Sequence, residues 1–133
     1  MVTSMGIEAL RDPERTQKPR DVGLTHVLDK GLSLAQIESM LEVGASYVDI
    51  VKFGWATSAV VENLDAKIDL YQRRGIPICC GGSMFEVAVK RGQLEDYIAF
   101  LKDKDFKLVE VSDGVVEMPT SEKLGYIERL AKD

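Results

Sequence analysis

The feature that most constrains the fold is a pattern that occurs four times along the chain. A short apolar run ends in polar residues or glycine and is followed by a helical pattern. The runs are "LTHVLDKG" (24–31), "YVDIVKFG" (47–54), "IPICCGG" (76–82) and "KLVEVSDG" (107–114). Each is short and rich in valine, isoleucine or leucine, which favours a strand. The alternation predicts a β-α-β-α-β-α-β-α chain with a parallel sheet and right-handed crossovers.

The segments between the runs carry signals for helix boundaries. Ser33 and Gln36 have the spacing of a capping box, and so do Ser83 and Glu86 before the third helical region. Gly92 is expected to interrupt that third region, because glycine breaks a helix interior. Apolar residues recur at helical spacing in each segment, so every strand is predicted to be followed by an amphipathic helix.

Two architectures fit this alternation. A (β/α)8 barrel of the TIM type needs about 250 residues, so four units would form its N-terminal half. An open flavodoxin-like parallel sheet is the alternative, and it can close within 133 residues. Residues 1–21 are predicted to be an exposed N-terminal arm and 22–133 the folded part. Both architectures place ligands at the carboxyl ends of the strands.

Polar residues and glycines collect at those predicted ends. Lys52 shares a strand face with Val48 and Ile50, so its ammonium group is expected either to reach water or to meet an anion. Thr57 and Ser58 are candidate caps for the following helix or anion-binding residues. The candidates for substrate binding are Asp29, Lys30, Gly54, Thr57, Ser58, Gly81, Gly82, Ser112 and Asp113.

Glu110 lies on the same strand face as Ser112, at the end of the fourth strand. Its carboxylate could bind Mg²⁺, orient a base, or simply pair with Lys52. The only histidine, His26, lies inside a predicted strand, where packing in the core or at the sheet edge is expected rather than catalysis. The residues alone do not decide among these three roles of Glu110.

Composition excludes several classes of function. The 22 acidic and 17 basic residues give a net charge of −5, which argues against a nucleic-acid-binding surface. No apolar run approaches the length of a membrane span, and no signal peptide is visible. The adjacent Cys79 and Cys80 do not suit a disulfide framework, so a cytoplasmic location is expected.

The ordered motifs "LDKG", "VKFGWATS", "GGSMFE" and "EVSDG", within residues 18–133, resemble those of the phosphosulfolactate synthase family. That resemblance implies a (β/α)8 barrel that adds sulfite to phosphoenolpyruvate, with Mg²⁺, to form (2R)-2-phospho-3-sulfolactate. In archaea and some bacteria this reaction starts a route to sulfonates such as coenzyme M. Plant heat-stress proteins are relatives with the same fold.

The resemblance implies roles for individual residues. Lys52 would act in catalysis by binding the carboxylate or phosphate of the substrate, and Glu110 would act in catalysis and hold the metal. Asp29 and Asp113 are second candidates for the metal, and a lysine outside these 133 residues is expected to be the general acid.

Two further functions stay open beside the synthase reading. One is a Schiff-base lyase with Lys52 as its nucleophile, and the other is a non-catalytic half-barrel or stress-related relative. The 133 residues alone are expected to be inactive, because barrels commonly bind substrate phosphate after strands 7 and 8. Such a chain is expected to form a homo-oligomer or to need a complementary C-terminal half.

Overall fold

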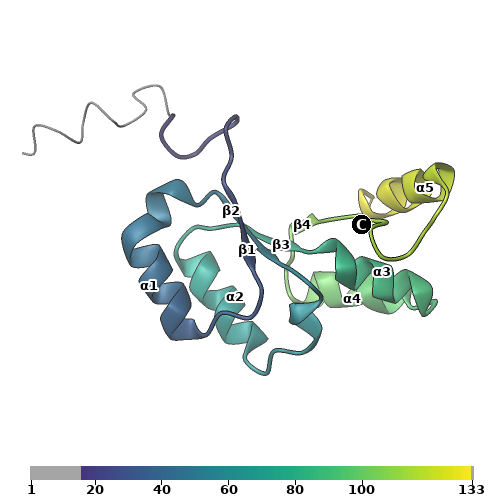
Figure 1. Cartoon of the computed structure of the whole chain (residues 1–133), viewed down its shortest axis with the longest axis horizontal. Helices are drawn as coiled ribbons and strands as arrows, with labels where there is room; N and C mark the ends of the chain where they lie inside the picture. Colours follow the sequence, from purple (N-terminus) through teal and green to yellow (C-terminus); the bar gives the residue numbers. More distant parts are fainter. Residues whose placement is uncertain (1–15, 133) are drawn as a thin grey trace, which may run out of the picture.

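Four parallel strands form a single sheet in the computed structural model, which describes residues 16–132. They are β1 (His26–Asp29), β2 (Ile50–Phe53), β3 (Ile78–Cys80) and β4 (Leu108–Val109), in the spatial order β1-β2-β3-β4. Figure 1 shows the strands running through the middle of the molecule. This sequential order is that of a (β/α)8 barrel. It contradicts the flavodoxin-like alternative, in which the strand order reverses beside the first strand.

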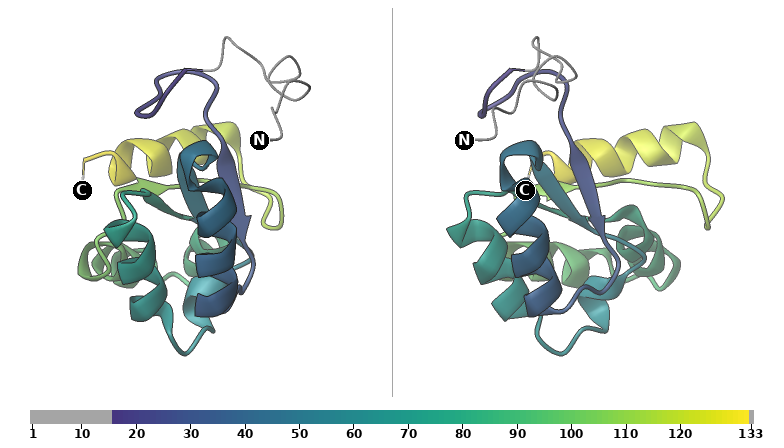
Figure 2. Two further views of the ribbon diagram at one scale, coloured as in Figure 1. Left: turned by 90° about the vertical axis from the view of Figure 1, so that its left-hand side faces the viewer. Right: turned by 60° about the vertical axis from the view of Figure 1, so that its left-hand side comes forward.

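Helices follow each strand as the pattern predicts. They are α1 (Leu34–Gly44), α2 (Leu64–Arg73), α3 (Gly82–Lys90), α4 (Leu94–Asp103) and α5 (Thr120–Leu130), with short 3-10 turns η2 (Ala45–Tyr47) and η3 (Thr57–Ala59). Figure 1 shows α1 and α2 together on one side, and α3, α4 and α5 beyond the other end of the sheet. Figure 2 shows α1 and α2 side by side in front of the strands. Within residues 16–132, no helix is long and apolar enough to cross a membrane.

The start of α1 confirms the first predicted cap, whereas the start of α3 corrects the second. Ser33 and Gln36 form the reciprocal hydrogen bonds of a capping box. For α3 the predicted box of Ser83 and Glu86 is wrong, because the helix begins at Gly82 with Gly81 as its N-cap and no side-chain cap. The Glu86 side chain turns instead to the loop after β4, since that loop offers it several donors.

The core lies between the helices and one face of the sheet. Val51 and Phe53 of β2 are both fully buried on this face. The Phe53 ring meets Tyr71 of α2 edge to face at 6.0 Å and Phe106, before β4, at 5.9 Å. Aromatic pairs in this arrangement add to the burial of apolar area. The packing of Phe53 therefore joins the first half of the chain to the segment that leads into β4.

The opposite face of the sheet is more open. The strand register places Leu28, Lys52, Cys79 and Leu108 side by side in one row across all four strands. Leu28 and Leu108, at the two ends of this row, are each 38% exposed. In a barrel this row faces the interior, so Lys52 is the charged member of an otherwise uncharged inner layer.

The described part of the N-terminal arm, residues 16–21, is attached to the end of the sheet remote from Lys52. Residues 1–15 of the predicted arm lie outside the described residues, but Arg20 donates to Asp49 at 2.6 Å, just before β2. The Thr25 amide donates to the same carboxylate at 2.8 Å, and together with Arg20 it lowers the pKa of Asp49 below its usual value. Arg20, in the described part of the arm, is thus fixed at the amino ends of the strands, away from the candidate site.

Candidate functional site

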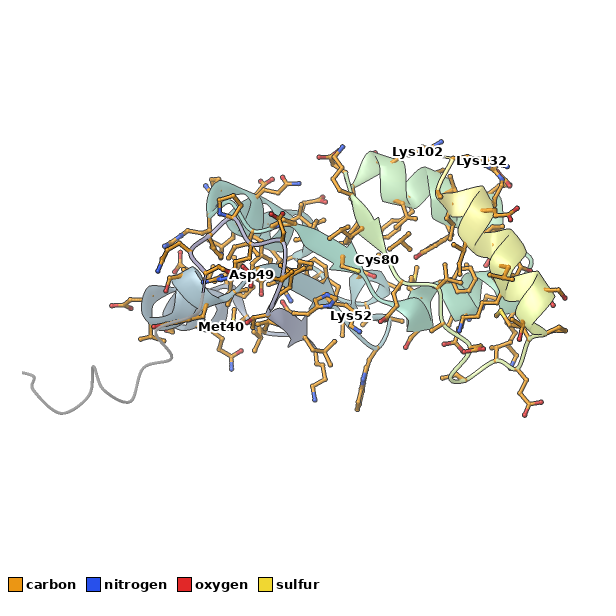
Figure 3. All side chains as sticks on the ribbon, turned by 90° about the horizontal axis from the view of Figure 1, so that it is seen from above. Met40, Asp49, Lys52, Cys80, Lys102 and Lys132 are labelled. Carbon is orange, nitrogen blue, oxygen red and sulfur yellow. The ribbon has the colours of Figure 1, made fainter. Side chains whose placement is uncertain are left out.

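Lys52 and Glu110 come together at the carboxyl ends of the strands. The ammonium group of Lys52 on β2 donates to Oε1 of Glu110, which follows β4, at 2.8 Å. Cys79 of β3 is the register partner of Lys52 and lies on the strand between β2 and β4. Figure 3 shows Lys52 near the centre of the molecule, between the α1–α2 side and the α3–α5 side. The structure therefore joins two residues that are 58 positions apart in sequence.

Glu110 also lies at the N-terminus of α3. Its second oxygen, Oε2, accepts the Gly82 amide at 2.9 Å. Burial alone would raise the pKa of Glu110, but the bonds from Lys52 and Gly82 hold it below its usual value, so the carboxylate is charged at neutral pH. The side chains of Lys52 and Glu110 are 24% and 41% exposed. A small molecule can thus reach both charges without any opening of the core.

The Gly81-Gly82 pair is explained by packing within the chain. A Cβ at Gly81 would lie 2.5 Å from the Phe53 carbonyl oxygen. A Cβ at Gly82 would overlap the Ser112 side chain and lie 3.3 Å from Oε2 of Glu110. Because the space beside both residues is filled, glycine is required for the start of α3 to approach β2 and the loop after β4. Gly82 and Ser112 are therefore neighbours of Glu110, as the sequence predicts.

The loop after β4 is held by the carboxylate of Glu86, which accepts hydrogen bonds from Ser112 and from backbone amides of the loop. Ser112 donates its hydroxyl to Oε1 of Glu86, and the amides of Val115 and Val116 donate to Oε2 at 2.7 and 2.6 Å. Asp113 is engaged on the outer side by Lys123 of α5 at 2.8 Å. The structure brings Ser112 beside Gly82 and Glu110, with its hydroxyl bonded to Glu86, and directs the Asp113 carboxylate to Lys123.

Asp29 does not join this cluster. Its side chain points to the helix side of the sheet and is completely buried, as is that of Lys67 on α2. Lys67 contacts both carboxylate oxygens, at 2.9 and 3.0 Å, and the Tyr71 hydroxyl donates at 3.0 Å. The amides of Gly31 and Leu32 donate to the same carboxylate at 2.8 and 2.9 Å. Asp29 thus stabilises the turn from β1 into α1.

Lys30 lies on the exposed side of that turn. Its ammonium group lies 5.0 Å from the ring centroid of Trp55, a cation–π contact, and Trp55 is 73% exposed. Trp55 and Ala56 both have a φ of 56°, a left-handed conformation that is uncommon for residues other than glycine. The structure therefore places Lys30 at the mouth of the sheet, with Trp55 as its partner.

Thr57, Ser58 and Gly54 shape the turn after β2. The Thr57 hydroxyl donates to the Gly54 carbonyl at 2.8 Å, and Ser58 is buried against the Cys80 sulfur at 3.9 Å. Neither caps α2, which begins at Leu64, because η3 separates them from that helix. Their predicted capping role is therefore wrong. Their contacts fix the turn that follows Lys52.

His26 lies two residues before Leu28 on the inner face of the sheet and is exposed rather than packed in the core. Partial burial and the charge of Lys52 lower the pKa of His26, so it is neutral at pH 7. Burial and the charge of Glu110 raise the pKa of Cys79 to about 11. Both groups near Lys52 are therefore uncharged at neutral pH, and Glu110 supplies the countercharge.

The described part of this site offers a magnesium ion one carboxylate, that of Glu110. Among residues 16–132, no group of three or more histidine, cysteine, aspartate or glutamate side chains is arranged to hold a metal. Mg²⁺, however, is commonly held by one or two protein carboxylates together with substrate phosphate oxygens and water. Glu110 fits such a shared arrangement, whereas the described residues do not form a metal cage by themselves.

Two residues have roles that the sequence did not predict: Glu86, which was expected only as a capping-box residue, and Lys67, the buried partner of Asp29. Glu86 lies one helical turn after Gly82, and residues four apart share a helix face, so its position beside the site could have been predicted. Lys67 lies between Leu64 and Ile68 in the apolar spacing of α2, which predicts a buried lysine. A buried lysine requires an anion, and Asp29 is that anion.

Comparison with known proteins identifies the relatives of the chain. Residues 13–133 match the family described as (2R)-phospho-3-sulfolactate synthase (ComA). Phosphosulfolactate synthases from Methanothermobacter thermautotrophicus and Methanocaldococcus jannaschii are 36% and 41% identical over 118 and 113 residues, which are 87% and 84% of this chain and 46% and 45% of the relatives. The Bacillus subtilis phosphosulfolactate synthase is 31% identical over 119 residues, covering 90% of this chain and 47% of the relative. The chain thus spans about half the length of the curated relatives it matches.

Proposed function

The chain belongs to the phosphosulfolactate synthase family, and on that premise we propose that it acts in the addition of sulfite to phosphoenolpyruvate, giving (2R)-2-phospho-3-sulfolactate. The observation that supports this proposal is the accessible Lys52–Glu110 pair at the carboxyl ends of the strands. Barrel enzymes place their chemistry at this end of the sheet.

The reaction joins two anions, sulfite and phosphoenolpyruvate, and this gives the positive charge of Lys52 a clear role. The sulfur lone pair of sulfite forms a bond to C3 of phosphoenolpyruvate, and the C2–C3 π electrons move toward C2 and the carboxylate. C2 then receives a proton from a general acid, for which we propose a lysine outside these 133 residues. Repulsion between the reactants is offset by a fixed cation, which acts most strongly where water is scarce. Lys52 supplies that cation by binding the substrate carboxylate or phosphate, while Glu110 holds the ammonium group in place.

We also propose that Glu110 holds Mg²⁺ jointly with the substrate. When bound, the ion would supply a Lewis acid that stabilises charge on the substrate carboxylate. Magnesium binding measured by calorimetry in the presence of phosphoenolpyruvate should weaken in Glu110→Gln, and a chelator should stop turnover until Mg²⁺ is restored. Turnover that is indifferent to chelation would contradict the metal proposal alone.

The cellular setting follows from the same proposal. A phosphosulfolactate product would enter sulfonate synthesis, of which coenzyme M is one end product. Cys79 and Cys80 are both buried free thiols, which suits a reducing compartment, so we place the reaction in the cytoplasm.

The direct test replaces Lys52 in the natural full-length polypeptide. Lys52→Met should lower sulfite-dependent consumption of phosphoenolpyruvate by about 100-fold or more, the scale on which removal of a preorganised charge-stabilising group acts. Lys107→Met is the matched control, because Lys107 is paired with Asp105 on an exposed surface. A folded Lys52→Met protein with normal turnover would refute the proposed site.

Lys52→Arg separates charge from nucleophilicity. Arginine keeps the positive charge but cannot form a Schiff base, so measurable turnover in this variant supports the electrostatic role. Complete loss in both variants, with trapping of a carbonyl substrate by borohydride in the wild type, would favour the Schiff-base alternative.

A further inference from the structure

Glu86 is a buried carboxylate that the proposed chemistry does not use. The residue is 3% exposed and lies on α3, one turn after Gly82. Burying a charged group is costly unless it is paired or well hydrogen-bonded. Glu86 has no cation among its described contacts, so hydrogen-bond donors must supply the compensation.

Four donors converge on this carboxylate from the loop after β4. The Ser112 hydroxyl and the Gly114 amide, the latter at 3.3 Å, donate to Oε1. The amides of Val115 and Val116 donate to Oε2 at 2.7 and 2.6 Å. Burial alone would raise the pKa of Glu86, but these bonds hold it below its usual value, so the group is ionised at neutral pH. Successive backbone amides directed at one anion form a nest, and here the occupant is part of the protein.

The nest is connected directly to Glu110. Ser112 packs so closely against Gly82 that no Cβ fits between them, and Gly82 donates its amide to Glu110. Glu110 and Ser112 are separated by a single residue, on the same short segment after β4. Because Glu86 holds this segment at Ser112 and again at residues 114–116, it limits the movement of the segment that carries Glu110.

We propose that Glu86 is a positioning residue for the candidate site: its carboxylate fixes the segment after β4 against α3 and so holds Glu110 beside Lys52. This inference rests on the proposed function only for its kinetic consequence. The structural part, an ordered segment 110–116 and a fixed Gly82–Glu110 bond, is independent of what the site catalyses.

The first experiment measures order without reference to activity. Hydrogen exchange of the natural polypeptide should show protected amides at Gly82, Val115 and Val116. Glu86→Gln keeps the shape but removes the charge, and it should speed exchange at all three positions. Glu95→Gln is the matched control, since Glu95 pairs with Arg129 on an exposed surface of α4 and α5, and its exchange pattern should equal that of the wild type.

Chemical rescue separates positioning from general loss of packing. Glu86→Ala removes the side chain beyond Cβ, and acetate has the size and charge to replace the removed group in the nest. Acetate should therefore restore slow exchange at Val115 and Val116, and acetamide, which has the same shape without the charge, should not. Because the rescue is measured on one variant with and without acetate, it stays informative if that variant is partly unfolded.

The kinetic experiment completes the test. Glu86→Gln should lower kcat for sulfite addition by about 10- to 100-fold, the scale expected for displacement of a reacting group by about 1 Å, with a smaller change in KM. Acetate should recover part of kcat in Glu86→Ala. Faster exchange at Val115 and Val116 with normal exchange at Gly82 and normal kcat would overturn the inference, because Glu86 would then hold the loop alone. Unchanged exchange in Glu86→Gln would also overturn it. A wild type that shows the exchange and rescue results but no sulfite addition would support the positioning of Glu110 and refute the proposed function.

Discussion

Replacing Lys67 with methionine tests the buried network around Asp29. The two side chains are completely buried and in contact through both carboxylate oxygens. Methionine matches the length of lysine but removes its charge, so Asp29 keeps only the Tyr71 hydroxyl and two backbone amides. Breaking a buried pair from one side leaves an uncompensated charge and costs about 3–5 kcal/mol.

That cost is large relative to the stability of a domain. The free energy of unfolding of a folded protein is about 5–15 kcal/mol, so Lys67→Met should remove about a fifth of it at the least and all of it at the most. Lys67 also lies 5.2 Å from the Phe53 ring centroid, a contact that methionine replaces with a weaker sulfur–aromatic one. In urea unfolding followed by circular dichroism, the midpoint should fall by about 1–5 M, which is the loss of about 3–5 kcal/mol divided by slopes of about 1–3 kcal/mol/M.

A double variant and an exposed pair provide the controls. Asp29→Asn combined with Lys67→Met removes both charges, so it should be more stable than Lys67→Met alone even though it carries one more substitution. Lys123→Met breaks the exposed pair with Asp113 and should cost about 1 kcal/mol or less. A loss below about 1 kcal/mol in Lys67→Met would refute the reasoning, because it would mean that water reaches Asp29.

Three further predictions concern the site and its surroundings. Because the folded pKa of Glu86 lies below its usual value of 4.5, the stability it contributes is fully present above that pH and is lost as the pH falls through the folded pKa. The free energy of unfolding of Glu86→Gln should therefore decline less steeply between about pH 5 and about pH 3 than that of the wild type, and parallel curves would contradict this. Gly82→Ala should cost about 1–3 kcal/mol of stability because the added Cβ overlaps Ser112. Gly125→Ala is the control and should be neutral or stabilising, since nothing lies near its added Cβ. Equal effects of the two variants in thermal unfolding would contradict the close packing of Gly82 against Ser112. Burial raises the pKa of Cys79 to about 11, so at pH 8 about one thiol in a thousand is ionised and iodoacetamide should leave this residue unmodified in the native protein but label it in urea, as mass spectrometry can show.

The sequence predicted the sheet and the position of Lys52 because those features depend on local pattern. Four short apolar runs ending in polar residues, each followed by a helical pattern, were enough to predict a parallel sheet. The alternation of side-chain direction along a strand placed Lys52 on the same face as Val48 and Ile50. Pairing of Lys52 with Glu110 was only one of several possible roles for Glu110, because a contact between β2 and the end of β4 depends on the strand register across β3. The strand register in the structure supplies that information.

The roles of Asp29 and Glu86 could not be read from local pattern. Asp29 is one residue beyond Leu28, and a single step along a strand moves a side chain to the opposite face. Its predicted role at the mouth of the sheet therefore depended on the exact phase of β1. Glu86 shares a helix face with Gly82, which places it beside the site, but its spacing with Ser83 also fits a capping box. The donors that it binds instead, in the loop after β4, lie 26 to 30 residues away, so local pattern could not predict those contacts.

The sequential strand order has a consequence for how the chain acquires its structure during synthesis. Residues paired across neighbouring strands, such as His26 with Ile50, Val51 with Ile78 and Cys79 with Leu108, are 24, 27 and 29 positions apart. Each strand thus needs only its immediate predecessor as a template, and loops of this length close at a modest entropic cost. At about 5–20 residues per second, a ribosome releases one such unit every few seconds, far longer than hydrophobic collapse takes. The sheet can therefore grow one strand at a time as the chain emerges, and at every stage the newest strand is both the template for the next and the exposed edge most open to pairing with another nascent chain.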